Sequence, residues 1–351
     1  MQLMHFSFAV RSTYLHFTTF SPPYRPSSPM KGAGTKVKSS YLRTIVACVL
    51  TISLVFFGLK YLLDHRDDLS SEEFFQKAYL ETISTHHTSV HISSKAASLP
   101  SRGLLFCFVL TAPKFHSVRV PSVSSTWLPR CDHGEVFTSS ETDLDETVPY
   151  RTLFRHLDDS YDTLFWKSKL ALQYSYTRIS PFFDWYLKAD DDTYVVVENL
   201  KKLLSKLDPA IPYYLGFRMK PYLRHGYNSG GAGYVLSRAA MGVFSSKLFP
   251  NSSLCPFNVF EDVGIGQCFE RVEIFPGDAR DSSGRQRFNL FTPSEMIRGG
   301  LKEEEQRSKW FFDDVKTGYE SISPEVVSFH HVSPELMEAL EVAIYRIRIP
   351  S

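Results

Sequence analysis

The sequence predicts an α/β domain with a mostly parallel central sheet flanked by helices. Apolar runs of strand length alternate along the chain with segments of helical spacing, which is the pattern of strands joined by helical crossovers. The clearest of these runs are continuously apolar, as expected of strands that are covered on both faces. An acidic triplet at 190–192 follows one such run, and ligands of these sheets bind beyond the carboxyl ends of the strands.

Local patterns predict the elements in chain order. The continuous apolar run LLFCFVL at 104–110 predicts the first strand. Apolar residues with helical spacing predict a helix over 161–178, and the amphipathic segment 197–207, which stops before Pro209, predicts another. The remaining expected elements are short strands at 135–138 and 213–216, strands on either side of the acidic triplet, and a helix that starts near Arg238.

The bulk composition excludes one broad class of function. A chain of 351 residues with a formal net charge of +1 has no basic excess, which argues against a generic nucleic-acid-binding protein. The length leaves room for one large domain or two ordinary ones. Its many Phe and Tyr residues favour a sizeable core and a cleft in which a sugar or a nucleotide stacks.

The N-terminal part predicts a membrane anchor. Residues 1–43 include basic but no acidic residues and are expected to form a cytoplasmic tail, whereas residues 44–59 carry no charge. If Lys60 snorkels, the apolar segment 44–63 has about 20 residues, enough to cross a hydrocarbon core of about 30 Å. Acidic residues follow it, so the charge bias predicts a single-pass type II protein whose remaining chain is luminal. A buried helix and a cleaved signal peptide are the alternatives.

The rest of the chain divides into a stem and a folded domain. Residues 64–100 lack a strong apolar pattern and are interpreted as a luminal stem with a short helix near 71–83. Residues 101–351 are predicted to form the folded luminal domain. A glycosylation sequon that begins at Asn251 fits the same compartment.

Cysteine usage agrees with an oxidising lumen. Cys48 lies in the predicted span, which leaves four cysteines for the luminal part. Four cysteines allow three pairings, and we expect Cys107–Cys131 with Cys255–Cys268 because this pairing closes the shortest loops. A zinc site is the competing interpretation, but the sequence contains no CxxC spacing.

The acidic triplet is the strongest single indicator of function. Apolar, β-prone residues flank Asp190, Asp191 and Asp192 on both sides, so the triplet is predicted to lie at a tight turn beside the core. Carboxylates in such a place need a cation to offset their charge, and oxygen ligands suit Mn²⁺ or Mg²⁺, which often bridges to phosphate. A solvated acidic turn is the alternative. Because adjacent side chains of an extended backbone point to opposite faces, Asp191 is expected to have only a supporting role.

Three further segments carry residues suited to chemistry. The stretch 228–237 has three glycines within four residues, which lets the backbone approach a ligand closely, although a plain tight turn explains it as well. The acidic pair Glu261-Asp262 could supply a general base or merely complement a helix dipole. The β-prone run 326–332 delivers His330 as an imidazole metal ligand, although most single His residues are not ligands.

Together, and in this order, the four segments resemble the β1,3-galactosyltransferases that build core 1 O-glycans. The matching sequences are WYLKADDDTYV, SGGAGYVLS, the EDV acidic pair and SFHHV, and the wider β1,3-glycosyltransferase group includes the Fringe enzymes. TWLPRC at 126–131 and FWKS at 165–168 also match, so the resemblance covers nearly all of the predicted luminal domain. Members of this family have the type II topology that the charge bias predicts here.

The resemblance implies an inverting glycosyltransferase of the GT-A fold that uses UDP-galactose and Mn²⁺. Asp190 and Asp192 would belong to the DxD motif, and His330 would complete the protein ligands to the metal. Asp262 would deprotonate the 3-OH of GalNAc on Ser or Thr of a glycoprotein, with Glu261 as the less favoured base. It further implies a catalytic domain at 101–351 on the luminal side of the Golgi membrane, and a homodimer is also among the expectations.

The same resemblance implies residues that contact the two substrates. The donor-binding candidates are Leu110, Thr111, Pro113, Lys167, Asp190, Gly230, Gly231, Gly233 and His331. Trp310 matches an aromatic residue that stacks on the acceptor sugar, and it joins Glu261 and Asp262 as the acceptor-binding candidates.

The chain also departs from the family pattern. Asp159-Ser160-Tyr161 stands where the family usually has Glu-Gly-Arg, which removes a cation expected near the donor, and His331 replaces a Tyr. A vicinal Cys pair is missing, and the region after Phe311 is shortened. Two alternatives therefore stay open: a non-catalytic or chaperone-like luminal paralogue, and a Fringe-like β1,3-N-acetylglucosaminyltransferase. Retention of the four candidate catalytic and metal residues favours an active galactosyltransferase.

Overall fold

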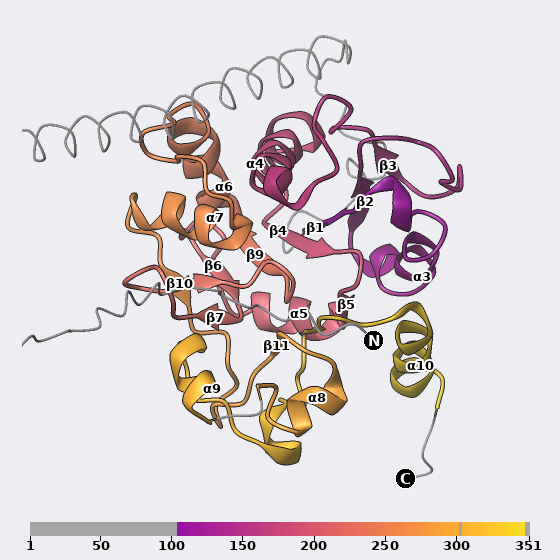
Figure 1. The fold of residues 1–351 in the computed structure, drawn as a ribbon, viewed down its shortest axis with the longest axis vertical. Coiled ribbons are helices and arrows are strands. Elements are labelled where there is room, and N and C mark those ends of the chain that lie inside the picture. The colour runs from indigo at the N-terminus through magenta and orange to yellow at the C-terminus, as the bar shows by residue number, and fades with distance from the viewer. Residues whose placement is uncertain (1–103, 302–303, 348–351) are drawn as a thin grey trace, which may run out of the picture. The chain divides into compact units, whose positions relative to one another are not determined.

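A seven-stranded mixed sheet lies at the centre of the computed structural model, which describes residues 104–301 and 304–347 (Figure 1). The strand order is β10-β6-β9-β4-β1-β2-β3. Neighbouring strands run parallel except where β9 pairs with β4 and with β6, so the prediction of a mostly parallel sheet is confirmed. The strands are β1 (Leu105–Leu110), β2 (His133–Phe137), β3 (Tyr150–Arg151), β4 (Trp185–Asp190), β6 (Tyr214–Gly216), β9 (Tyr234–Ser237) and β10 (Pro276–Gly277).

Two smaller sheets and a set of helices complete the described part. The strands are β5 (Tyr194–Val195), β11 (Phe288–Asn289) and β12 (Ser328–Phe329) in one sheet and β7 (Arg218–Met219) and β8 (Tyr227–Asn228) in the other. The α-helices are α3 (Val120–Ser125), α4 (Leu164–Tyr174), α5 (Val197–Leu204), α6 (Arg238–Val243), α7 (Glu261–Glu270), α8 (Pro293–Ile297), α9 (Glu304–Trp310) and α10 (Pro334–Tyr345). Short 3₁₀ and π turns are η1 (Pro113–Phe115), η2 (Leu128–Arg130), η3 (Tyr161–Thr163), η4 (Ser175–Ile179), η5 (Phe244–Leu248) and η6 (Gly318–Ser321).

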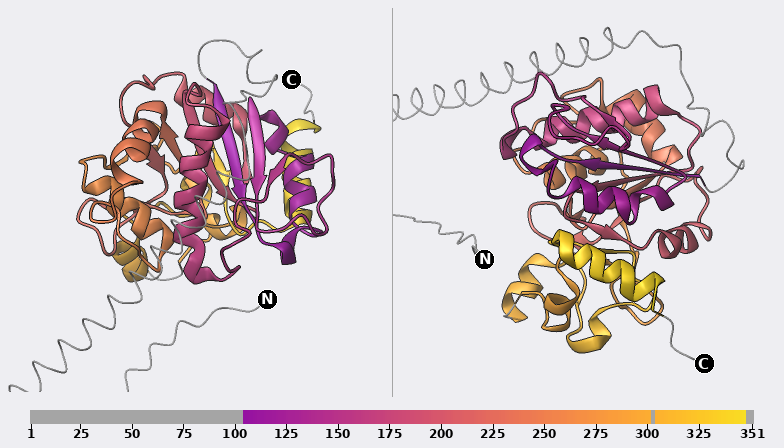
Figure 2. Two further views of the ribbon diagram at one scale, coloured as in Figure 1. Left: turned by 90° about the horizontal axis from the view of Figure 1, so that it is seen from above. Right: turned by 90° about the vertical axis from the view of Figure 1, so that its right-hand side faces the viewer.

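Strand β1 is apolar along its whole length, and β4 is buried as far as Ala189, because helices cover both faces of the sheet (Figure 2). Alternate residues of β1 enter two different cores. Leu105, Cys107 and Val109 pack with side chains of α3 and α5, whereas Phe106 and Phe108 pack with those of α4, α6 and α7. The sheet therefore holds its carboxyl-terminal strand ends rigidly, which is where the acidic triplet begins.

The expected elements agree with the structure to within a few residues. The strand predicted at 104–110 is β1, and the predicted helix over 161–178 forms as η3, α4 and η4 in succession. The helix predicted over 197–207 ends earlier, at Leu204, and continues as turns that bring the chain to Asp208. The strand predicted at 135–138 is β2, which starts two residues earlier because it pairs with β1 from His133 onward.

Both expected disulfides are present. Cys107 of β1 is bonded to Cys131, which follows η2, and Cys255 is bonded to Cys268 of α7. The predicted tail (1–43), span (44–63) and stem (64–100) with its helix lie outside the described residues. Within the described residues, no helix combines the length and the apolar character that a membrane crossing requires.

Candidate active site

The acidic triplet lies at the turn between β4 and β5, as predicted. β4 is buried up to Ala189, and the Thr193 amide donates to the Asp190 carbonyl 3.1 Å away, which closes the turn. Leu110, the last residue of β1, is in register with Asp190. The turn therefore opens at the carboxyl ends of two parallel strands, the usual ligand side of such sheets.

A buried lysine neutralises part of the site. The ammonium group of Lys188 lies 2.5 Å from Asp190 Oδ1 and 4.0 Å from Glu261 Oε2, and it donates to the Gly230 carbonyl at 3.2 Å. Burial alone would favour the neutral amine, but the charges of Asp190 and Glu261 raise the pKa of Lys188 above its ordinary value. Lys188 thus links the triplet to the glycine-rich stretch and to the acidic pair.

Asp191 points away from this lysine. Its carboxylate accepts hydrogen bonds from Thr111 Oγ1 at 2.6 Å and from Arg119 Nη1 at 2.6 Å. Burial raises the pKa of Asp191 to about 6, against the opposing effects of Thr111 and Arg119. These contacts hold the Asp191 side chain in place and agree with the supporting role expected for it.

Asp192 faces two histidines. His330 Nε2 lies 3.3 Å from Asp192 Oδ1, and the imidazole rings of His330 and His331 stack with centroids 3.8 Å apart. One ligand atom from each of these three residues lies within 4.8 Å of the others. Burial opposes ionisation of Asp192, but contact with His330 and the charge of Arg119, 3.2 Å away, lower the pKa of Asp192 to about 2. The carboxylate is therefore ionised at neutral pH.

This group of three residues fits a divalent metal ion. One carboxylate and two imidazoles are ligands that first-row divalent ions accept. His330 Nδ1 is buried and has no hydrogen-bond partner among the described residues, so a ring nitrogen is left for a ligand. Asp190, which the sequence also suggested as a ligand, lies on the same turn, but its carboxylate is paired with Lys188.

The glycine-rich stretch forms the floor between the histidines and the acidic pair. A Cβ atom on Gly231 would lie 2.0 Å from His330 Cε1, and one on Gly230 would lie 2.5 Å from Glu261 Oε2. Gly233 has a φ of 77°, which only glycine adopts without strain. Glycine is therefore required at 230 and 231, because Glu261 and His330 lie too close to the backbone for a Cβ atom. This stretch is not a plain surface turn.

The acidic pair begins α7. Asp262 accepts from the Gly230 amide at 3.5 Å and from the Val263 amide at 2.8 Å, whereas Glu261 is buried and accepts from Tyr234 Oη at 3.0 Å. Burial, followed by the negative charge of Glu261, raises the pKa of Asp262 to about 6. A carboxylate with a pKa close to neutrality that is not fully buried is suited to act as a general base.

Four of the donor-binding candidates lie in two further places. Leu110, Thr111 and Pro113 follow the carboxyl end of β1, beside the acidic turn, although the side chain of Leu110 is buried in the core of α4 and α7. Lys167 of α4 is buried, and its ammonium group lies 2.5 Å from Asp159. Asp159 stands where the resemblance leads us to expect Glu, so the carboxylate partner of this candidate donor-binding lysine is kept, and the lost cation is the one at Tyr161.

Three aromatic side chains form a series of ring contacts that starts two residues before Asp262. Trp310, at the end of α9, makes an edge contact with Tyr222 at 6.3 Å between centroids. Tyr222 stacks on Phe260 at 5.9 Å, and Phe260 is two residues before Asp262. Tyr222 is 65% exposed and has a φ of 76°, an unusual backbone conformation for a bulky residue. We call Tyr222, Phe260 and Trp310 the aromatic platform.

Sequence reasoning missed Lys188, Arg119, Tyr222 and Phe260. Lys188 gave a usable signal: a lysine inside an apolar strand, two residues before Asp190, must lie on the same strand face as that carboxylate. Arg119 gave none, because it is 72 residues from Asp191 and belongs to no motif. The platform is likewise assembled from three distant segments.

Comparison with known proteins identifies the relatives of the chain. The Fringe-like family matches residues 102–277. Glycoprotein-N-acetylgalactosamine 3-beta-galactosyltransferase 1 of Xenopus laevis is 33% identical over 261 residues, which cover 73% of this chain and 70% of the relative. Beta-1,3-glucosyltransferase of Mus musculus is 32% identical over 178 residues, which cover 48% of this chain and 34% of the relative.

Solved structures of glycosyltransferases also match. One is galactosyltransferase LgtC in complex with donor and acceptor sugar analogues, with a TM-score of 0.38 and 11% identity over 69% of this chain and 97% of that chain. The assignment rests on the sequence relatives. The structure of this chain is a mixed sheet covered by helices, with the acidic turn at its ligand side. The chain therefore belongs to the core 1 β1,3-galactosyltransferase family within the Fringe-like glycosyltransferases, and it is an enzyme of the hexosyltransferase class.

Proposed function

We propose that the enzyme transfers galactose, with inversion, from UDP-galactose to the 3-OH of GalNAc linked to Ser or Thr of glycoproteins. One observation carries the proposal. The glycine-rich stretch contacts both His330, a candidate metal ligand, and Asp262, the candidate base. Gly231 packs on His330, and the Gly230 amide donates to Asp262. A nucleotide sugar on this floor would have its diphosphate near Asp192 and His330 and its reacting carbon toward Asp262.

Asp192 and His330, with Asp190 from the DxD motif, are the proposed protein ligands for Mn²⁺. When bound, the ion supplies a Lewis acid that offsets the charge developing on the UDP leaving group. Lys188 holds Asp190 and Glu261 in place, and Arg119 fixes Asp191 and Asp192 from the other side.

Asp262 is the proposed general base. Its carboxylate accepts the proton of the acceptor 3-OH while that oxygen attacks the anomeric carbon of galactose. The new carbon–oxygen bond forms as the bond from the anomeric carbon to the phosphate oxygen breaks, so UDP leaves with the electron pair and the anomeric configuration inverts. The amides of Gly230 and Val263 hold the carboxylate in one orientation for this proton transfer.

The aromatic platform is the proposed acceptor side. Exposed aromatic rings stack on the apolar faces of sugar rings, and Phe260, the residue immediately before α7, lies two residues before Asp262 in the chain. Trp310 keeps the acceptor role that the sequence suggested, and Tyr222 and Phe260 extend it.

The cellular setting remains a prediction. The two disulfides and the exposed sequon at Asn251 support a luminal domain, which would be held at the Golgi membrane by the span at 44–63. A homodimer also stays a prediction.

A transfer assay tests the proposed function. The purified full chain is incubated with Mn²⁺, a GalNAc-bearing peptide and, separately, UDP-galactose, UDP-N-acetylglucosamine and UDP-glucose. We expect galactose transfer that Asp192→Ala abolishes, with loss of Mn²⁺-dependent UDP binding. His225→Gln is the matched control, because His225 contacts Glu270 and Phe275, and none of these three residues belongs to the proposed site.

The donors separate the alternatives. Transfer of N-acetylglucosamine instead of galactose would identify a Fringe-like enzyme. Absence of transfer from every donor, together with absence of Mn²⁺-dependent UDP binding, would leave the non-catalytic paralogue as the better interpretation.

A further inference from the structure

His331 lies in the ligand group although the sequence assigned it to the nucleotide sugar. Its backbone has a φ of 58°, in the left-handed region, and its ring stacks on that of His330 at 27° between planes. A ring nitrogen of His331 is among the three ligand atoms that lie within 4.8 Å of one another. The second imidazole therefore approaches the same point in space as Asp192 and His330.

The backbone around His331 is held from both sides. The His330 amide donates to the Asn289 carbonyl at 3.2 Å, and the Val332 amide donates to the Asp192 carbonyl at 2.9 Å. The second bond ties the histidine pair directly to the acidic turn. An uncommon backbone conformation that the surroundings impose on a single residue is characteristic of functional sites. Here it turns the His331 ring onto His330 and toward Asp192.

We propose that His331 is a direct protein ligand of the metal, so that a second imidazole joins His330 and the carboxylates of Asp192 and Asp190. The inference rests on the metal site of the proposed function and goes beyond it in one respect. Imidazole ligands favour borderline ions such as Co²⁺ and Zn²⁺ relative to Mn²⁺, whereas carboxylates suit Mn²⁺ and Mg²⁺. A site with two imidazole ligands should therefore prefer Co²⁺ over Mn²⁺ more strongly than a site with one imidazole ligand.

Metal titration without nucleotide tests the proposal directly. Co²⁺ and Mn²⁺ are titrated separately into the purified full chain by calorimetry, and the visible absorption of bound Co²⁺ reports its ligands. His331→Asn is the informative variant, because asparagine tolerates a positive φ and leaves the backbone unstrained. His225→Asn is the control, since it removes an imidazole that contacts Glu270 instead.

We expect His331→Asn to weaken Co²⁺ binding by about tenfold or more, since even outer partners of metal ligands are commonly worth 10- to 100-fold in affinity. Mn²⁺ binding should weaken less, so the preference for Co²⁺ over Mn²⁺ falls, and the absorption spectrum of bound Co²⁺ should change. The control should match the wild-type chain in all three measurements.

Two results overturn the proposal. One is a wild-type chain that binds neither ion without nucleotide, and the other is a His331→Asn variant with an unchanged Co²⁺ preference and spectrum. If that variant loses only UDP binding, His331 contacts the nucleotide sugar. If the wild-type chain transfers galactose and His331→Asn keeps the wild-type preference for Co²⁺, the proposed function stands and only His331 leaves the ligand set.

Discussion

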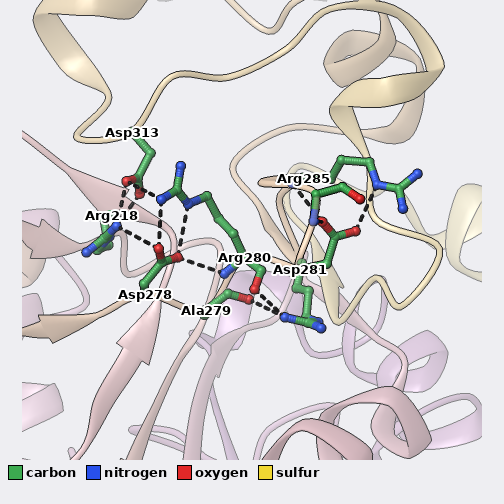
Figure 3. Close-up of polar contacts among 9 residues, drawn as sticks. Arg218, Asp278, Ala279, Arg280, Asp281, Arg285 and Asp313 are labelled. Atoms are coloured by element: carbon green, nitrogen blue, oxygen red, sulfur yellow. Dashed lines mark hydrogen bonds and ion pairs between the residues drawn. The ribbon is translucent and has the colours of Figure 1, made fainter.

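Two clusters of charged side chains in this protein differ in how their charges are balanced. The first is the candidate active site, where the carboxylates of Asp190, Asp191, Asp192, Glu261 and Asp262 lie around Lys188 and Arg119. The second, which we call the arginine–aspartate network, consists of Arg218, Asp278, Arg280 and Asp313 (Figure 3). It joins β7 to the segment after β10 and to the segment after α9.

Charges in the network cancel. Arg218 Nε donates to Asp313 Oδ2 at 2.8 Å, and Arg280 Nη2 donates to Asp278 Oδ2 at 2.7 Å. Each arginine also contacts the other aspartate, at 3.4 Å in both cases. Two cations thus meet two anions, with every carboxylate shared, which is an arrangement that stabilises three chain segments and needs no ligand.

Charges in the active site do not cancel. Five carboxylates meet two permanently charged cations, and the pKa values of Asp191 and Asp262 are both raised to about 6 by burial in this surrounding. An excess of buried negative charge is costly unless a further cation joins it. The comparison teaches that imbalance, more than the number of charged residues, distinguishes a binding site from a structural ion-pair network.

The largest effect is expected from Asp262→Asn. The amide keeps the shape of the side chain but accepts no proton, so galactose transfer should fall by about 10²- to 10⁴-fold. Transfer rates under saturating donor measure the effect, and Mn²⁺-dependent UDP binding should persist. Asp313→Asn, the same change in the network, should leave the transfer rate per folded molecule unaltered. A loss of less than tenfold for Asp262→Asn would assign the base to another residue.

Removal of one cation should lower the free energy of unfolding more in the first cluster than in the arginine–aspartate network. Lys188→Met leaves Asp190 and Glu261 with no paired cation among the described residues, which should lower the free energy of unfolding by about 3–5 kcal/mol. Arg218→Met should lower it by only about 1–3 kcal/mol, because Arg280 still pairs with both aspartates. Urea unfolding of the full chain measures both values. Equal losses would contradict the difference in charge balance.

The smallest effect concerns pH. Because the pKa of Asp262 is raised to about 6, the fraction of deprotonated base, and with it kcat/KM, should fall about tenfold between pH 7 and pH 5. A raised folded-state pKa means that protonation favours the folded chain, so Asp262 contributes no loss of stability in this window.

The network should not respond over the same range. A hydrogen bond from Arg280 is the main cause that lowers the pKa of Asp278 to about 2. Its stabilising contribution is therefore present above the unfolded-state pKa near 4 and is lost only as the pH falls toward 2. A pH–rate profile with parallel urea unfolding checks both clusters. Activity that stays constant down to pH 5 would contradict the raised pKa of Asp262.

Much of the fold followed from patterns between near neighbours. The continuous apolar run of β1, the β-prone residues on either side of the acidic turn, the helical spacing at 161–178 and the shortest-loop disulfides were all predictable. Covered strands and helices select side chains at fixed short spacings. The four motifs likewise indicated the family, which the sequence relatives confirm.

The composition of the site was less predictable. The sequence suggested Asp190, Asp192 and His330 as a ligand group, but the packed chain brings His331 into contact with His330 and pairs Asp190 with Lys188. Which carboxylate stays free depends on where a lysine ammonium lies in three dimensions, and spacing along the chain does not specify that.

The sequence by itself determined the elements, the disulfides, the acidic turn and the family, since each depends on residue types at short spacings or on motifs retained as a set. Only the tertiary structure decided the partners of the buried charges. Arg119 reaches Asp191 from 72 residues away, and Lys188 approaches Glu261 from a different element. The physical reason is that buried charges interact over a few ångströms in space, and packing of distant segments sets those distances.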